Sequence, residues 1–200
     1  WPMLRVWEKT NNNLIKEKAI KTLSLICKKT SNNGEILDWG FKPNEPAFTH
    51  TIAYTLRGII ESAIILDRWD DFGCFAEKAL DKFYRLSELK NGALPGSFSK
   101  GWVGDSSYSC LTGNVQIAIC LIRYESLFPD LRLINASCKL VDYVNSKQKN
   151  VGTLVGAVGG SYPIWGKYMF LRYPNWAAKY HADAIMLLIK RLELERKNNV

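Results

Sequence analysis

The chain has 200 residues, of which 47% are hydrophobic and 23% charged, and its formal net charge is +8 at pH 7. This length and apolar content suit one domain with a substantial core. No apolar run approaches the roughly 18 residues of a membrane-spanning helix. The lysines are dispersed along the chain and are not grouped with aromatic residues, so we expect neither a membrane nor a nucleic acid as partner.

The N-terminal sequence has no signal-peptide pattern and no initiator methionine. We therefore expect the chain to be the C-terminal part of a longer protein. Five cysteines occur, and none of them forms a CxxC pair. An odd number without metal-ligand spacing predicts reduced, buried thiols, a cytoplasmic location, no metal and no cofactor.

Apolar residues recur at three- and four-residue spacing in six segments, which predicts six helices. An aspartate-rich turn at 67–71 separates the second helix from the third, and Phe128-Pro-Asp130 separates the fourth from the fifth. Pro174 opens the sixth, where a proline costs no helical hydrogen bond. The predicted helices are 12–29, 48–67, 71–88, 109–127, 131–148 and 174–195.

The predicted helices alternate in character. The segments 48–66 and 111–122 are apolar on almost every side, so we expect them to be buried on several sides. The helices at 12–29, 71–88 and 131–148 carry Lys, Glu and Asp on one face. This alternation is typical of the inner and outer helices of a curved double layer.

A repeat runs through the chain. Trp39, Trp102 and Trp165 are spaced 63 residues apart, and Gly92-Ala-Leu-Pro-Gly-Ser-Phe98 aligns with Gly156-Ala-Val-Gly-Gly-Ser-Tyr162. Such a period is typical of repeat architectures. The unit reads as helix, short turn, helix and a long loop rich in glycine and aromatic residues. We therefore predict an all-α fold of repeated helical hairpins of about 60 residues.

The period, the alternating helices and the aromatic loops resemble the α/α-toroid superfamily, which includes six-hairpin glycosidases, polysaccharide lyases, sugar epimerases and terpenoid cyclases or prenyltransferases. The resemblance covers about residues 12 to 195 and implies that 1–200 form one domain, a partial α/α toroid. The stretches 48–58, 160–166 and 173–177 look like proteins of bacterial polysaccharide metabolism. A complete toroid has about twice the predicted hairpins, so we expect missing upstream hairpins or self-association.

The resemblance implies an active site at the ends of the inner helices, below the long loops. The residues themselves point to the helix at 48–67, where His50, Tyr54, Arg57 and Glu61 form one stripe. A polar stripe on a buried helix must face a partner or a water-filled cavity. We predict His50 as an acid or base and Arg57 as a ligand for a carboxylate or phosphate. The alternative is an Arg57–Glu61 salt bridge with a capping histidine.

Two other helices carry candidate binding residues. The helix at 109–127 offers Asn114 and Gln116, and the helix at 174–195 offers Asn175, Lys179 and Asp183 at four-residue spacing. Unlike groups that converge on one centre suit a ligand better than a symmetric structural role. The alternative is that Asp183 pairs with Lys179 alone.

The long loops carry the remaining candidates. Flat aromatic faces beside hydroxyls and amides suit sugar rings, although the evenly spaced tryptophans also suit a plug between hairpins. Glycoside hydrolysis needs two flanking carboxylates, and Asp105 with Glu61 or Asp183 is the candidate pair. The candidate loop residues are Trp102, Asp105, Tyr108, Tyr162, Trp165 and Tyr168.

The sequence therefore favours a carbohydrate-active domain that binds, and cleaves or epimerises, an acidic oligosaccharide or polysaccharide. One alternative is a non-catalytic helical-repeat module for protein interaction or assembly. Another is an isoprenoid-handling toroid enzyme. That enzyme needs an acidic DxDD-type motif, which the chain lacks, as it also lacks the Cys and His zinc ligands of the lanthionine cyclases.

Overall fold

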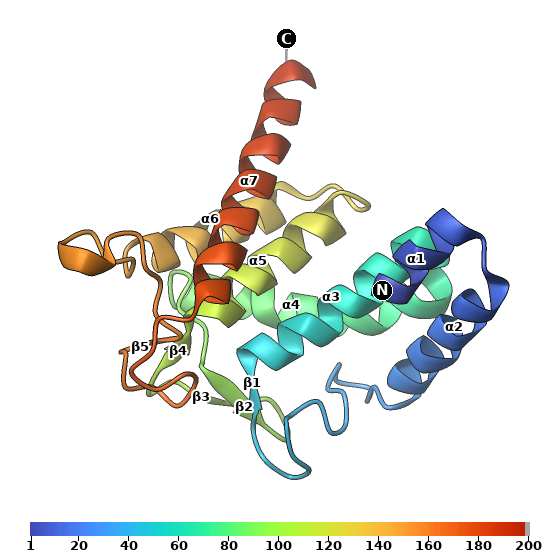
Figure 1. Ribbon diagram of the computed structural model, residues 1–200, viewed down its shortest axis with the longest axis horizontal. Helices are drawn as coiled ribbons and strands as arrows, with labels where there is room; N and C mark the ends of the chain where they lie inside the picture. The colour runs from blue at the N-terminus through green and yellow to red at the C-terminus, as the bar shows by residue number, and fades with distance from the viewer. Residues whose placement is uncertain (199–200) are drawn as a thin grey trace.

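The computed structural model describes residues 1–198 and is built of helical hairpins (Figure 1). The inner helices α3 (Thr49–Leu66), α5 (Leu111–Glu125) and α7 (Asn175–Asn198) lie next to one another, with α5 in the middle. The outer helices are α2 (Asn13–Lys28), α4 (Cys74–Leu89) and α6 (Leu131–Asn145), and α4 and α6 pack against each other and against α5. The predicted all-α class and the six predicted helices are confirmed.

Two helical segments were not predicted. α1 (Pro2–Thr10) has a proline in its first turn, buries Leu4 against the body and ends at Asn11 in the left-handed conformation. The second segment overlaps the predicted turn at 67–71. It is a single π-helical turn, η1 (Trp69–Gly73), that runs into α4. The Trp69 ring lies where a side chain of Gly73 would be, so only glycine allows this turn.

Short strands tie the long loops together. β1 (Ala47–Phe48), β2 (Ser97–Ser99) and β3 (Val103–Asp105) form an antiparallel sheet, with Phe48 opposite Ser97 and Ser97 opposite Asp105. β4 (Ser109–Cys110) pairs with β5 (Ser161–Tyr162), and Gly152–Leu154 forms the short 3-10 turn η2. Because β1 leads into α3 and β4 leads into α5, the sheets fix the N-terminal ends of both inner helices.

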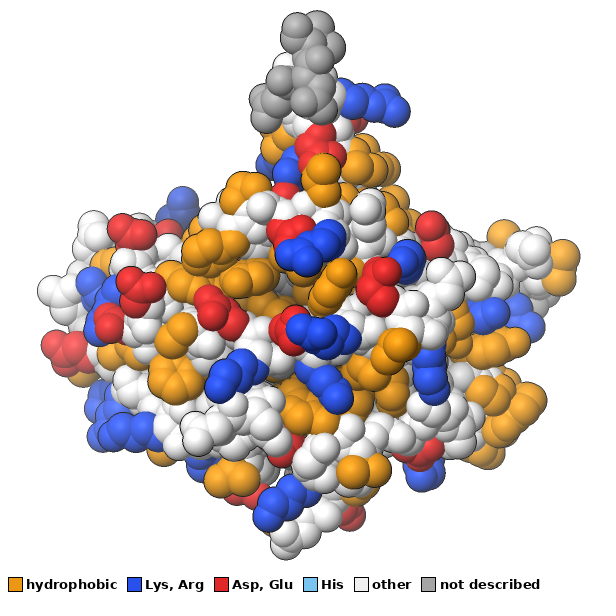
Figure 2. All heavy atoms as spheres, turned by 180° about the vertical axis from the view of Figure 1, so that it is seen from behind, with side chains coloured by type: hydrophobic (Ala, Val, Ile, Leu, Met, Phe, Trp, Pro, Cys, Tyr) orange, Lys and Arg blue, Asp and Glu red, His pale blue; other side chains and the backbone are white. Residues whose placement is uncertain are grey.

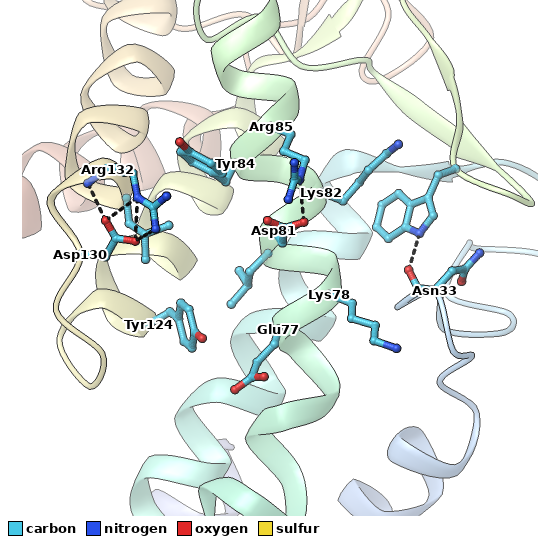
Figure 3. Close-up of a pocket in the computed structure, with 13 residues that line it drawn as sticks. Asn33, Glu77, Lys78, Asp81, Lys82, Tyr84, Arg85, Tyr124, Asp130 and Arg132 are labelled. Carbon is cyan, nitrogen blue, oxygen red and sulfur yellow. Dashed lines mark hydrogen bonds and ion pairs between the residues drawn. The ribbon is translucent and has the colours of Figure 1, made fainter.

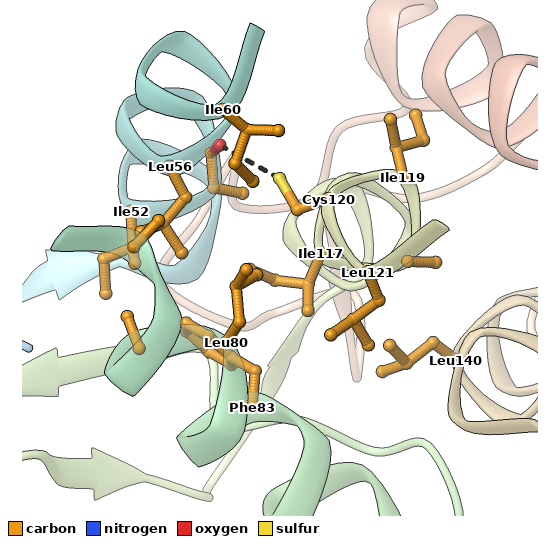
Figure 4. Packing of buried hydrophobic residues seen from close by; sticks show 14 of the residues in the cluster. Ile52, Leu56, Ile60, Leu80, Phe83, Ile117, Ile119, Cys120, Leu121 and Leu140 are labelled. Atoms are coloured by element: carbon orange, nitrogen blue, oxygen red, sulfur yellow. Dashed lines mark hydrogen bonds between the residues drawn. The ribbon is translucent and has the colours of Figure 1, made fainter. Parts of the chain in front are cut away.

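The core fills the space between the helix layers. Ile52, Leu56 and Ile60 of α3 pack toward α5, α4 contributes Leu80 and Phe83, and all residues of α5 from Leu111 to Ile122 are buried (Figure 4). α5 is thus buried on every side. α3 is buried on several sides, as predicted, but Tyr54 is 48% exposed. α3 therefore has one open face.

The burial of the cysteines agrees only in part with the prediction from the sequence. Cys27, Cys110 and Cys120 are buried, but Cys74 is exposed and Cys138 half-buried, so the prediction of buried thiols is wrong for these two. Cys74 lies at the first position of α4, on its solvent side. Within residues 1–198, no helix has both the length and the apolarity that crossing a bilayer requires.

The repeat provides a matched test of the packing. Gly92 and Gly156, aligned by the repeat, both have φ +85°, but a Cβ on Gly92 would lie 2.1 Å from the carbonyl oxygen of Lys139, whereas one on Gly156 would meet nothing within 4 Å. Alanine at either position costs about 1–2 kcal/mol for the left-handed backbone. We expect Gly92→Ala to cost about 1–3 kcal/mol more, because α6 must also move. Urea unfolding measures both, and equal losses would contradict this rigid close approach.

Candidate functional site

A cavity of about 100 Å³ opens where the three inner helices meet. We call it the inner-helix cavity. Ala53 and Ile119 supply apolar wall, and the other lining side chains are polar or aromatic. Of the predicted polar stripe of α3, Tyr54 and Arg57 line this cavity, whereas His50 and Glu61 do not. The lining residues are Trp1, Ala53, Tyr54, Arg57, Gln116, Ile119, Lys179, Tyr180 and Asp183.

A larger groove of about 950 Å³ lies on the outer helices, beside α4 and the start of α6 (Figure 3). Its charged side chains largely neutralise one another, since Arg85 binds Asp81 and Arg132 binds Asp130, each at 2.8 Å. Figure 2 shows the face opposite to that of Figure 1, where apolar, acidic and basic side chains are interspersed. The inner-helix cavity, with groups from three helices converging, is the better candidate site.

The N-terminal end of α3 is held in place by the loop before α5. The Thr49 amide donates to the carbonyl of Gly96, and the Thr49 hydroxyl donates to the carbonyl of Pro95 at 2.5 Å. Gly113 of α5 lies so close to α3 that a Cβ added to it would be 2.7 Å from the backbone nitrogen of His50. This close approach lets Gln116 of α5 reach His50, whose Nδ1 donates to Oε1 of Gln116 at 2.8 Å.

His50 lies between aromatic rings. The centroid of its ring is 4.6 Å from that of Tyr54 and 5.0 Å from that of Tyr168. Burial lowers the pKa of His50, and the hydrogen bond that His50 donates to Gln116 offsets this only in part. Because the ordinary pKa of a histidine is already below 7, the imidazole is neutral at pH 7. A neutral imidazole can accept a proton, which is the chemistry predicted for His50.

Tyr54 and Tyr180 join α3 to α7 through a short hydrogen bond between their hydroxyls. Burial and this contact raise the pKa of Tyr54 to about 12. The Tyr54 hydroxyl therefore stays protonated at neutral pH and can act as a hydrogen-bond donor and acceptor. Tyr180 was not predicted as a site residue, although the repeat places it at the position of Tyr54.

The rings at the site form a continuous series, which we call the aromatic track. Neighbouring centroids are 4.6 to 6.0 Å apart along it. One end, Phe41, is 70% exposed in a loop, and the other end lies in the inner-helix cavity. Of these rings, only Tyr168, His50 and Tyr54, in the middle of the track, are predicted from the sequence. Its members in spatial order are Phe41, Phe48, Tyr168, His50, Tyr54 and Tyr180.

Glu61 lies below the cavity in a buried ion cluster and does not line it. Its carboxylate is 2% exposed and accepts from Nε of Arg57 at 2.7 Å and from Nε of Arg123 at 2.8 Å. Burial acts to raise the pKa of Glu61, but Arg123 and Arg57 outweigh it and hold the pKa below its ordinary value. A carboxylate held by two arginines is fully engaged, which matches the structural alternative for this residue.

Two basic side chains, Arg57 and Lys179, and one acidic side chain, Asp183, line the cavity. Arg57 keeps its terminal nitrogens free of Glu61, since only Nε of its guanidinium donates to that carboxylate. Lys179 forms an ion pair with Asp183, and its Nζ also lies 4.3 Å from the centre of the Tyr180 ring. Two cations against one carboxylate favour an anionic ligand.

Several predicted site residues do not line the cavity. Asp105 binds Lys167 at 2.7 Å, and Lys167 and Ser107 lower its pKa to about 2. Trp102 packs against Trp39 and Phe83, as the plug interpretation predicted. Asn114 is fully buried and donates to the carbonyl of Gly92, and Tyr108 is packed against Gly96 and Gly166. His50 and the buried Tyr168 are also not among the lining residues, so His50 lies next to the cavity and not on its wall. Three more predicted residues lie in exposed positions: Tyr162, Trp165 and Asn175. The plug interpretation is therefore wrong for Trp165, which is 66% exposed.

The donor groups at the site do not form a metal centre. Among residues 1–198, no group of three or more His, Cys, Asp or Glu side chains is close enough to hold a metal ion. The cavity wall offers phenol hydroxyls, a carboxamide and charged side chains, and the imidazole of His50 lies next to it, bound to Gln116.

A comparison with known proteins shows which fold the chain shares. No protein-family model matches the chain, and no curated protein matches it in sequence. Among the solved structures, cellobiose 2-epimerase from Spirochaeta thermophila DSM 6192 is similar, with a TM-score of 0.71 at 12% sequence identity. The alignment covers 95% of this chain and 50% of that one, so the chain spans about half its length. The chain therefore has the fold of part of an α/α toroid, as seen in a sugar epimerase.

Proposed function

We propose that the inner-helix cavity and the aromatic track bind a carbohydrate, and that His50 transfers a proton on it. The observation that carries this proposal is the position of His50, which is neutral and lies within a series of aromatic rings beside a polar cavity. Aromatic faces suit the apolar CH faces of sugars, and hydroxyls and amides suit their polar edges. A structural relative that acts on cellobiose supports the same assignment.

Of the reactions considered, epimerisation fits the cavity best. It removes a proton from a carbon next to a carbonyl group and returns a proton to the opposite face. A neutral imidazole is a suitable base near pH 7, and a tyrosine hydroxyl can donate to the carbonyl oxygen as negative charge develops there. Glycoside hydrolysis needs two carboxylates. Among the described residues, Asp183 is the one carboxylate that lines the cavity, and Lys179 neutralises it.

The free nitrogens of Arg57 support an acidic sugar as the ligand. Their planar arrangement matches a carboxylate. A uronic acid unit placed in the cavity would present its carboxylate to Arg57 and its ring to the aromatic track. This is the acidic oligosaccharide that the sequence led us to expect in bacterial polysaccharide metabolism.

Replacement of Arg57 tests this assignment. We expect Arg57→Ala to weaken binding of a glucuronic-acid-containing disaccharide about tenfold or more, with little effect on cellobiose, because a charge-assisted hydrogen bond is lost. Isothermal titration calorimetry measures both affinities, and Arg132→Ala on the outer face is the control. The helix content should remain, because Arg123 still binds Glu61. Equal binding by both variants, or loss of folding, would make Arg57 purely structural.

The assembly module remains the second candidate, and α7 favours it. The C-terminal half of α7 projects beyond the other helices (Figure 1) and exposes Met186, Ile189, Leu192 and Leu194. Exposed apolar patches often mark association surfaces. We propose a second copy of this chain as the partner of this surface.

Analytical ultracentrifugation tests the association. The parent chain should sediment as a concentration-dependent dimer or larger species, and Ile189→Glu should shift it to the monomer, because a charge there opposes burial. Val151→Glu, at an exposed loop position, should leave the distribution unchanged. A parent chain that stays monomeric at high concentration contradicts the module.

A further inference from the structure

Gln116 is hydrogen-bonded to His50 and also lines the cavity. It lies on α5, is 5% exposed, and lines the inner-helix cavity. Its side-chain oxygen is 2.8 Å from Nδ1 of His50. A carboxamide oxygen can only accept a hydrogen bond, so Nδ1 must carry the proton. Because a neutral imidazole has one ring proton, Nε2 of His50 is left with a free lone pair.

Tyr54 and Tyr180 lie beside Gln116 on the wall of the inner-helix cavity. Their hydroxyls share a short hydrogen bond in which either oxygen can be the donor. Gln116 therefore connects the imidazole of His50 to the polar wall of the cavity.

We infer that Gln116 is a positioning residue, which holds His50 as the Nδ1–H tautomer. Nε2 of His50 is then the ring nitrogen that can accept a proton. This inference rests on the proposed function for its ligand. The matching ligand has an acidic C–H or O–H next to a carbonyl or hydroxyl oxygen, as an open-chain sugar does.

A second histidine serves as an internal reference. The chain has two histidines, and the other one, His181, is bound through Nε2 to Oδ1 of Asn145 at 2.6 Å. By the same reasoning His181 carries its proton on Nε2. The two histidines should therefore have opposite tautomers, although both are neutral because burial lowers the pKa of each.

Long-range ¹H–¹⁵N NMR of the intact chain at neutral pH distinguishes the tautomers without any sugar. We expect Nδ1–H for His50 and Nε2–H for His181. Gln116→Leu should move His50 toward the Nε2–H form that free histidine prefers and leave His181 unchanged. Gln148→Leu, whose side chain contacts Gly156 in an exposed loop, should change neither. Nε2–H on His50 in the parent, or no change in Gln116→Leu, would overturn the inference.

The conservative variant keeps the test valid if Gln116→Leu fails to fold. Gln116→Glu retains an acceptor oxygen, so His50 should keep Nδ1–H, and the added negative charge should raise the pKa of His50 in an NMR titration. An unchanged pKa of His50 would mean that residue 116 does not act on the imidazole. Because neither measurement uses a ligand, a failed tautomer test and a failed sugar-binding test are separate outcomes.

Discussion

Buried ion pairs between successive inner helices hold this structure together. Glu61 of α3 is bound by Arg123 of α5, and Glu125 of α5 is bound by Arg191 of α7 at 2.6 Å. Both carboxylates are almost completely buried. Removing one partner of such a pair costs about 3–5 kcal/mol, because a buried charge is left unpaired. The pairs therefore fix the position of each inner helix against the next.

This fixed arrangement is what makes a site possible. With α3, α5 and α7 held side by side, Tyr54, Gln116 and Tyr180 face one cavity although they come from three repeats. The anchoring pairs recur from one helix junction to the next, whereas the cavity side chains differ between repeats. A repeated scaffold thus carries an asymmetric set of groups, with a base, hydroxyl donors and basic side chains, as a ligand without symmetry requires.

The sequence predicts the helices well, because their apolar periodicity is local information. It also predicts that His50, Tyr54 and Arg57 share a face, since helix geometry alone determines this. It offers the Arg57–Glu61 salt bridge as an alternative, but it does not reveal the second partner of Glu61, because Arg123 is 62 residues away. Tyr180 was visible in the repeat alignment but was passed over. The strands have only two or three residues and pair across distant loops, so they leave no periodic pattern.

The central claim is that His50 transfers a proton on a sugar in the inner-helix cavity, and heavy water tests it most directly. Cellobiose incubated with the chain in deuterium oxide should gain deuterium at C2 of its reducing sugar, as detected by NMR. His50→Gln should abolish this exchange, whereas His181→Gln should retain it if folded. No exchange by a folded parent chain that binds cellobiose, or equal exchange by the parent and His50→Gln, would contradict the account.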